Sequence, residues 1–261
     1  MQAPLTRLPT DHGPTGQWGW MGKRLVLNFH GIGEPHDWVD QSERRYWCTE
    51  RNFLSILDTV PQASEELRIP IDLTFDDGNV SDIEVAAPAL QERGMSAVFF
   101  VCAGRIGKPG YLDASQMQDL AGAGMTIGSH GWDHVDWRRL TDNDALHREV
   151  YQARDFIEDT VAQPVESVAI PFGSYDHRVW KTATKAFSAV YTSDGGLAPR
   201  SRGTVPRASY TADGDSNSLP GLAARGPLLR SCRRALAMAY KRHRSPQRAA
   251  LPTTARSSSF A

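Results

Sequence analysis

Residues 71–78 read Ile-Asp-Leu-Thr-Phe-Asp-Asp-Gly, an apolar run that ends in two adjacent carboxylates and a glycine. Short apolar runs of this kind are typical of strands buried on both faces, so we predict a strand over Arg68–Phe75. Two acids at the end of a buried strand are costly to desolvate unless a cation lies beside them. Because neighbouring side chains of a strand point in different directions, one of the two carboxylates can bind a metal while the other faces a water molecule. The alternative is a surface turn, since Asp-Asp-Gly is favourable turn chemistry.

A second polar motif follows an apolar segment, where residues 129–134 read Ser-His-Gly-Trp-Asp-His. Two histidines four residues apart, His130 and His134, can bind one ion from a helix or a tight loop. No Glu follows His130, so the zinc-protease motif H-E-x-x-H is excluded. Together with Asp77 the pair makes a two-His, one-carboxylate set, which leaves coordination positions open as catalytic metal sites do. A pair of surface loop histidines is the alternative for this motif.

A third motif, Pro171-Phe172-Gly173, again follows a strand-like segment. A turn with this composition can form the wall of a pocket and present a backbone N–H to an oxyanion. An ordinary turn that terminates a strand is the alternative.

Seven segments have the composition of strands, and helix-like segments separate most of them. Parallel neighbours need crossover connections, so the alternation predicts a parallel α/β sheet, and seven strands favour a barrel over an open sheet. The predicted strands are Arg24–His30, Arg68–Phe75, Met95–Cys102, Met125–Ser129, Glu166–Ile170, Ser188–Thr192 and Gly203–Arg207. The predicted helices are Tyr46–Asp58, Asp82–Arg93, Ser115–Ala121, Thr141–Val161 and Asp176–Phe187.

The length of 261 residues fits one large α/β domain. No apolar run approaches the roughly 20 residues that span a bilayer. The first 22 residues lack the apolar segment of a secretory signal, so we expect a cytoplasmic protein. The three cysteines are far apart, which favours free thiols over a disulfide framework.

Charge is distributed unevenly, because nine Lys or Arg residues but no Asp or Glu follow Asp215. Apolar and basic residues interleave over Leu228–Arg244, which predicts a basic amphipathic helix, and the residues beyond it have a disordered composition. The predicted organisation is therefore a polar leader over 1–23, a catalytic domain over 24–215, a basic helical segment over 216–244 and a disordered tail over 245–261.

In their order and at their strand ends, the three motifs resemble those of the polysaccharide deacetylase family, also called the NodB-homology or carbohydrate esterase 4 family. The resemblance covers roughly Arg24 to Arg207. It implies a distorted (β/α)7 barrel with a metal-dependent deacetylase site at the C-terminal mouth. It also implies the roles of the residues: Asp76 is the general base, Asp77, His130 and His134 bind the metal, and the backbone N–H of Phe172, after Pro171, binds the oxyanion.

The sequence departs from the family's pattern in three places. Ala169 stands where many members have an Arg that orients the catalytic aspartate. The family's Leu-x-His motif, which supplies a general acid, has no counterpart here, and residues 192–195 echo the fourth motif only faintly. His30 ends the first strand, and barrel closure would bring it to the mouth. We therefore expect His30 to contact substrate or donate the proton, the alternative being a structural histidine.

Pro171 and three further residues are candidates for substrate binding. Trp132 and Trp137 can stack on a sugar ring, although Trp132 can equally pack over the metal ligands. Arg207, at the end of the last strand, can pair with a catalytic aspartate or with an anionic leaving part of the substrate, and a plain salt bridge is the simpler alternative.

The sequence thus predicts a hydrolase that removes the N-acetyl group from a polysaccharide, lipid-linked or nucleotide-linked sugar. We expect Zn²⁺ as the metal, with Co²⁺ or Ni²⁺ as alternatives. The alternative functions are a carbohydrate-binding pseudo-enzyme and an O-acetyl esterase. A nucleic-acid partner is excluded by the acidic core and by a tail with few aromatic residues. The basic segment is typical of a solvated extension, and the functional alternative is peripheral contact with an anionic membrane at its cytoplasmic face.

Overall fold

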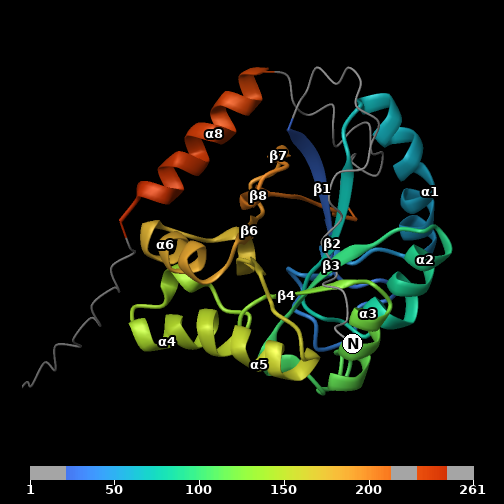
Figure 1. Cartoon of the computed structure of the whole chain (residues 1–261), viewed down its shortest axis with the longest axis horizontal. Coiled ribbons are helices and arrows are strands. Elements are labelled where there is room, and N and C mark those ends of the chain that lie inside the picture. The colour runs from blue at the N-terminus through green and yellow to red at the C-terminus, as the bar shows by residue number, and fades with distance from the viewer. Residues whose placement is uncertain (1–21, 213–227, 246–261) are drawn as a thin grey trace, which may run out of the picture.

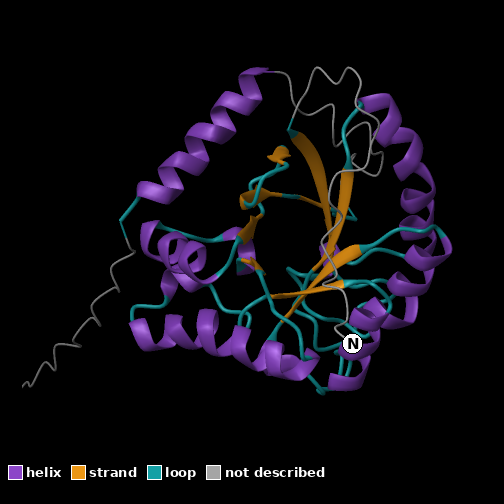
Figure 2. Ribbon diagram, viewed as in Figure 1, coloured by secondary structure: helices purple, strands orange, loops and turns teal. Residues whose placement is uncertain are grey.

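The computed structural model describes residues 22–212 and 228–245, and every segment predicted to be a strand contains one. Seven parallel strands follow one another around a nearly closed barrel (Figures 1 and 2), in the order β1-β2-β3-β4-β5-β6-β8. Their bounds are β1 Lys23–Phe29, β2 Ile71–Phe75, β3 Ala97–Val101, β4 Thr126–Ser129, β5 Ser167–Ala169, β6 Ala189–Thr192 and β8 Gly203–Pro206. The predicted distorted seven-stranded barrel is confirmed.

Two short strands that the sequence analysis missed close the barrel. β7 (Leu197–Pro199) pairs antiparallel with the start of β1, at Lys23, Arg24 and Leu25. β9 (Ala208–Ser209) pairs parallel with the end of β1, at Leu27 and Asn28. Only Arg207 separates β8 from β9, so the last strand pairs with β6 before this residue and with β1 after it.

Helices cover the outside of the barrel (Figure 2). They are α1 Glu50–Leu67, α2 Ala87–Glu92, α3 Ala114–Gly122, α4 Asn143–His147, α5 Ala153–Val161, α6 His177–Ala186 and α8 Leu228–His243. A π-helical turn precedes α2 at Asp82–Ala86, and another joins α4 to α5 at Arg148–Gln152.

The helix predicted over Tyr46–Asp58 is wrong at both ends. It begins at Glu50, because the Thr49 side chain accepts a hydrogen bond from the Asn52 N–H and caps it. It continues past Pro61 to Leu67 and ends where Arg68 adopts a left-handed conformation, with φ of 54°. The following strand therefore begins at Ile71 rather than at Arg68.

Two apolar cores lie on the two faces of the strands. The larger one lies between strands and helices and includes the stacked rings of Phe29, Phe75 and Phe99. The smaller one fills the barrel interior with Val26, Phe100, Ala169, Tyr191, Ala198 and Val205. Because side chains alternate along a strand, residues two positions beyond Val26 and Val205 also point inward. These residues are Asn28 and Arg207, so a polar layer follows the apolar one inside the barrel.

The leader predicted over 1–23 and the tail predicted over 245–261 lie outside the described residues except at their inner ends, so these domain boundaries stay predictions. Within residues 22–212 and 228–245, no helix has the length and apolar character that a membrane crossing requires.

Candidate functional site

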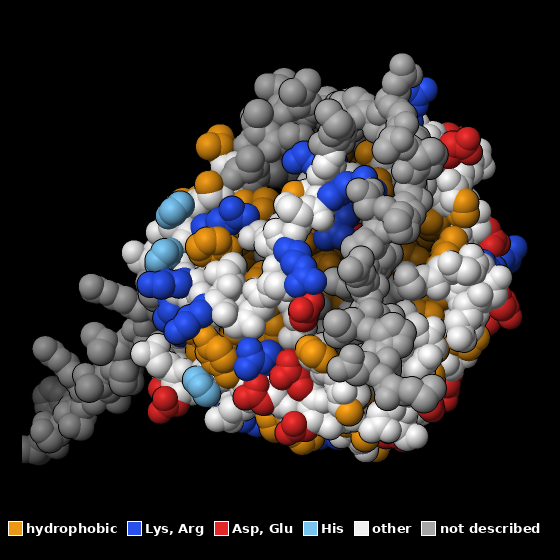
Figure 3. Space-filling model, in the orientation of Figure 1, with side chains coloured by type: hydrophobic (Ala, Val, Ile, Leu, Met, Phe, Trp, Pro, Cys, Tyr) orange, Lys and Arg blue, Asp and Glu red, His pale blue; other side chains and the backbone are white. Residues whose placement is uncertain are grey.

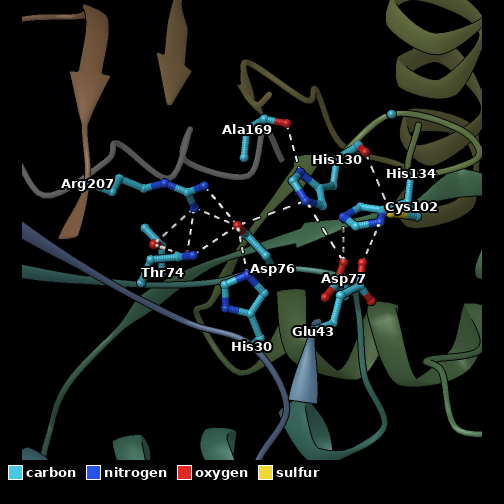
Figure 4. A network of polar contacts seen from close by, with 12 residues as sticks. His30, Glu43, Thr74, Asp76, Asp77, Cys102, His130, His134, Ala169 and Arg207 are labelled. Carbon is cyan, nitrogen blue, oxygen red and sulfur yellow. Dashed lines mark hydrogen bonds and ion pairs between the residues drawn. The ribbon is translucent and has the colours of Figure 1, made fainter. Parts of the chain in front are cut away.

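A cavity of about 510 Å³ opens at the carboxyl ends of the parallel strands. Asp76 and Asp77 follow β2, His130 and His134 follow β4, and the turn with Phe172 follows β5. The structure therefore brings the three predicted motifs to one place, as Figure 4 shows for the aspartates and histidines. The lining is completed by His30, Glu43, Tyr46, Ser193, Asp194, Gly195, Gly196, Arg207, Ala208, Ser209 and Thr211.

Asp76 is buried and accepts hydrogen bonds on both carboxylate oxygens. Arg207 donates through Nη1 to Oδ1 at 2.6 Å and through Nη2 to Oδ2 at 2.8 Å. Asn28 adds a third bond, from Nδ2 to Oδ2 at 2.9 Å. Burial alone would raise the pKa of Asp76, but the charge and hydrogen bonds of Arg207 outweigh it, so the pKa lies well below its usual range. Asp76 is therefore an ionised carboxylate in a fixed orientation.

Arg207 lies between β8 and β9, beside β1, and Figure 4 shows its guanidinium directed at Asp76. Its side chain is fully buried, and its guanidinium lies over the rings of Phe100 and Tyr191, 5.3 and 5.8 Å from their centroids. Nη1 also donates to Oδ1 of Asn28 at 2.7 Å. Of the roles expected for Arg207, the structure shows the pairing with Asp76, the aspartate predicted to be the general base. A substrate contact by Arg207 stays a prediction.

Asp77, His130 and His134 form the cluster expected of a metal site, with ligand atoms within 4.8 Å of one another. His130 has Nδ1 at 2.8 Å from the carbonyl oxygen of Ala169, so this nitrogen donates and Nε2 keeps its lone pair towards the cavity. Nε2 of His130 lies 3.9 Å from Oδ1 of Asp77, and Nε2 of His134 lies 3.3 Å from the same oxygen. Oxygen and nitrogen atoms whose lone pairs face one another in a buried site are stabilised by a cation between them. The three side chains therefore fit a divalent metal.

The second histidine has a partner on its far side as well. Nδ1 of His134 lies 3.4 Å from Oε1 of Glu43, an arrangement that orients a metal-binding imidazole. Burial lowers the pKa of His134 to about 4, although the charge of Asp77 opposes this, so the ring is neutral near pH 7. Burial also raises the pKa of Glu43, and the charge of Asp77 adds to this effect.

Backbone conformation is unusual at three residues of the site. Among the described residues five non-glycine positions have positive φ, and three of them line the cavity: Asp77 at 81°, His134 at 54° and Phe172 at 58°. Such conformations persist where surrounding contacts impose them, and they concentrate at functional sites.

Glu149 imposes the shape of the loop between the two histidines. Its buried carboxylate accepts from the backbone N–H groups of Trp132 at 2.8 Å and Asp133 at 3.1 Å, and from Nε1 of Trp137 at 3.0 Å. Glycine is required at position 131, because φ is +83° there and a Cβ would lie 2.6 Å from Oε2 of Glu149.

The tryptophans do not line the cavity. Trp137 is fully buried, and Trp132 packs on Phe156, with ring centroids 5.4 Å apart, and under Arg148. The predicted sugar stacking by Trp132 and Trp137 is therefore wrong, and Trp132 packs on Phe156 and Arg148 rather than over the metal ligands. Phe172 is an aromatic residue that does line the cavity, where 57 % of its surface is exposed and its ring lies 4.6 Å from that of His134.

The turn that carries Phe172 is shaped by local bonds, since the Gly173 N–H donates to the Ile170 carbonyl and the Ser174 N–H to that of Pro171. Pro171 itself is buried below the turn. Within the described residues no backbone carbonyl accepts from the Phe172 N–H. His30 reaches the cavity as expected, with Nε2 3.9 Å from Oδ2 of Asp76 and Nδ1 buried without a described partner.

Sequence reasoning missed four residues of the site: Asn28, Glu43, Arg105 and Glu149. Arg105 donates from Nη1 to Oδ1 of Asp77 at 3.0 Å. Each lies on a different strand, loop or helix from its partner, so no short motif contains both. Asn28 could have been found from the sequence, because it lies two positions after Val26 in the same strand and therefore points into the same barrel interior.

Comparison with known proteins identifies related chains. Residues 65–188 match the family model described as polysaccharide deacetylase. YxkH of Bacillus subtilis (strain 168), provisionally named as a polysaccharide deacetylase, is 30% identical over 132 residues, which are 50% of this chain and 47% of YxkH. The chain thus spans about half the length of the curated relative that it matches.

Solved structures share the fold. A polysaccharide deacetylase from Bacillus cereus superposes with a TM-score of 0.62 and 20% identity, over 74% of this chain and 66% of the other. The deacetylase PplD of Streptococcus pyogenes, solved in complex with acetate, gives a TM-score of 0.62 and 19% identity over 73% and 93%. IcaB from Ammonifex degensii gives a TM-score of 0.62 and 22% identity over 78% and 98%.

Proposed function

Because residues 65–188 of this chain are a polysaccharide deacetylase domain, we propose that the protein is a divalent-metal-dependent hydrolase that removes the acetyl group from an N-acetylated sugar. The observation that carries the proposal is the convergence of Asp77, His130 and His134 within 4.8 Å of one another, with the ionised Asp76 beside them in the same cavity. A module that only binds glycans has no need of an oriented, ionised carboxylate next to three side chains that can hold a metal.

A divalent cation held by these three residues would polarise the acetamide carbonyl and bring the pKa of a water from about 15.7 towards roughly 7. Acidification of the water matters here because Arg207 makes Asp76 a weak base. Asp76 accepts one proton from the attacking water, and Arg207 and Asn28 keep its oxygens oriented.

The remaining steps use Phe172, after β5, and His30, beside Asp76. The backbone N–H of Phe172 donates to the oxyanion that forms when water adds to the carbonyl. His30 gives a proton to the leaving nitrogen as the carbon–nitrogen bond breaks, and the proton taken up by Asp76 replaces it. Water and the acetamide are thereby converted into acetate and a free amino sugar.

The proposed roles of Asp76 and His134 can be separated by experiment. Asp76→Asn should lower kcat steeply and leave metal content nearly intact, because Asp76 is not one of the three ligands. His134→Ala should lose the metal. Elemental analysis of both variants after dialysis against Zn²⁺ measures the difference, and equal metal content in the two would contradict the assignment.

Acetate release should be screened over N-acetylated oligosaccharides, lipid-linked sugars and nucleotide-sugars, with Zn²⁺, Co²⁺ or Ni²⁺ added to chelator-treated protein. O-acetylated sugars belong in the same screen. Acetate release from the O-acetyl ester but not from the N-acetyl amide would show that the protein is an esterase. Release from none of these substrates would favour the pseudo-enzyme alternative.

The basic C-terminal segment bears on where the protein acts. We place the protein in the cytoplasm, acting on an intermediate of cell-surface polysaccharide synthesis and touching an anionic membrane through its basic C-terminal segment. The excess of Lys and Arg residues after Asp215 supports the membrane contact. Absence of binding to anionic lipid vesicles at low salt would remove the membrane contact and leave the catalytic proposal intact.

A further inference from the structure

The C-terminal end of α8 lies against the segment that follows the Phe172 turn. We propose that this end, through Lys241 and Arg244, is a positioning element that fixes the turn at the cavity rim. The inference rests on the proposed function, because it assigns the turn's N–H to the oxyanion. Figure 3 shows His, Lys and Arg side chains gathered on the left of the molecule, where α6 and the end of α8 lie in Figure 1.

Lys241 joins two loops of the rim. Its ammonium lies 2.5 Å from Oδ1 of Asp194, a cavity-lining residue whose side chain is only 6% exposed. It also donates to the carbonyl oxygen of Gly173 at 3.4 Å. The other oxygen of Asp194 accepts from the hydroxyl of Tyr175 at 2.8 Å. One buried carboxylate is thus held by a cation from α8 and by a phenol from the segment after the turn.

Residues 242–244 extend this contact along the chain. Arg244 donates to the carbonyl oxygen of Tyr175 through Nε at 3.0 Å and through Nη2 at 2.5 Å. The backbone N–H of His177 donates to the Arg244 carbonyl at 3.3 Å, and Nδ1 of His177 lies 2.9 Å from the Arg242 carbonyl. Lys241 and Arg242 of α8 and Arg244 just after it therefore bind the stretch 173–177, which starts within the turn and ends at the first residue of α6.

The turn needs such support because its geometry is not the preferred one. Phe172 has φ of 58°, which a residue with a side chain adopts at a cost. The two rim loops also touch, since a Cβ on Gly173 would lie 2.8 Å from Cβ of Ser193. Without Lys241, Asp194 would keep a buried charge with only the Tyr175 hydroxyl as a partner, and both loops would be free to rearrange.

The basic side of this contact lies outside the residues that match the family model, because Lys241 and Arg244 lie well beyond residue 188, where the match ends. The basic segment therefore has a role inside the molecule as well as any role outside it. Because an oxyanion donor acts in the transition state, displacement of the turn should change kcat more than KM.

The test compares Lys241→Met with Lys241→Arg and with Lys185→Met, each in the full chain. Lys185 is an exposed lysine of α6 that pairs with none of the described residues, so it controls for the loss of one charge. We expect Lys241→Met to lower kcat by about tenfold or more with KM nearly unchanged, since small misplacements of a reacting group have effects of this size. Lys241→Arg should recover most of the loss, and Lys185→Met should match the unmodified protein.

Hydrogen–deuterium exchange provides a readout that does not depend on activity. Peptides covering residues 170–176 and 192–197 should exchange faster in Lys241→Met, while those covering 126–134 stay unchanged. Equal exchange at the rim in Lys241→Met and Lys185→Met would overturn the positioning role, whatever the enzyme's substrate. Faster exchange at the rim with an unchanged kcat would overturn the link to catalysis. Absence of deacetylation in the unmodified protein would reject the proposed function, but the exchange experiment would still test whether Lys241 positions the turn.

Discussion

Arg207 and Asp76 set the charge balance of the site at the scale of single residues. Asp76 is buried in the barrel interior, where an unpaired carboxylate would hold its proton, and the fork of Arg207 keeps it ionised. Position 169 is an alanine, and the guanidinium beside Asp76 comes from Arg207 on the last strand. We interpret Arg207 as the residue that orients Asp76, the proposed base.

Arg207→Met should move the acid limb of the pH–rate profile to higher pH. With Arg207 absent, burial dominates and the pKa of Asp76 rises, so the base becomes protonated and activity is lost at a pH where the unmodified protein still works. The free energy of unfolding should fall by about 3–5 kcal/mol, as for other buried pairs that lose one partner. Measurement of kcat/KM against pH checks the shift.

Arg202→Met is the matched control, because Arg202 pairs with Glu166 on the surface, where both side chains are more than half exposed. An unchanged acid limb in Arg207→Met would show that another group sets it.

His30 is the residue to which proton donation is assigned. His30→Ala should lower kcat, because the leaving amine then has no proton donor beside Asp76 in the cavity. Addition of imidazole to the variant should restore part of the rate if proton transfer is what was lost. A variant that keeps the unmodified kcat would return His30 to a structural role.

At the scale of elements, the loop between the two histidines depends on the π-helical turn at Arg148–Gln152. That turn carries Glu149, whose two oxygens serve three N–H donors of the loop. A helix of the outer layer thereby fixes His130 and His134, the predicted metal ligands, at the mouth of the barrel.

Glu149→Gln should weaken metal binding and lower the free energy of unfolding by about 1–3 kcal/mol, because the amide NH₂ would face an N–H donor in place of an acceptor. Chelator competition measures the affinity and urea denaturation of the metal-free protein measures stability. Glu166→Gln, at an exposed ion pair, should change stability by less than about 1 kcal/mol. If the two variants behaved alike, Glu149 would not shape the site.

At the scale of the whole molecule, closure of the barrel packs several titratable groups into one buried cluster. His30 and His134 both have lowered pKa values, burial being the first cause in each. In the unfolded chain each histidine takes up a proton near its ordinary pKa of 6.5, whereas folded His134 does so only near 4. Between these values the unfolded state binds more protons, so stability is lost as pH falls.

Burial raises the pKa of Asp82 and of Glu43, which acts in the opposite direction, so the contribution of His134 is measured as a difference between two proteins. On acidification from pH 7 to pH 5 the urea midpoint of the metal-free protein should fall relative to that of His134→Gln, because glutamine does not titrate. Urea midpoints of both proteins, measured with a chelator present, check this statement. Equal changes in midpoint for the two proteins would contradict the predicted contribution of His134.

The sequence by itself determined the residues whose roles follow from local order. Apolar runs identified the seven parallel strands, and motifs at strand ends identified Asp76, Asp77, His130 and His134, because parallel strands bring their carboxyl ends to one edge of a sheet. Boundaries were less certain, since Pro61 lies inside α1 and the short strands β7 and β9 carry little apolar signal.

Tertiary structure alone decided what holds these residues in place. Arg207 lies 131 positions from Asp76, and Glu149 lies 16 and 17 positions from the N–H groups that it binds in the histidine loop. Such partners meet because the barrel closes and side chains alternate inward, which no short segment encodes. Local chemistry thus specified which groups can react, and closure of the barrel specified which charges surround them.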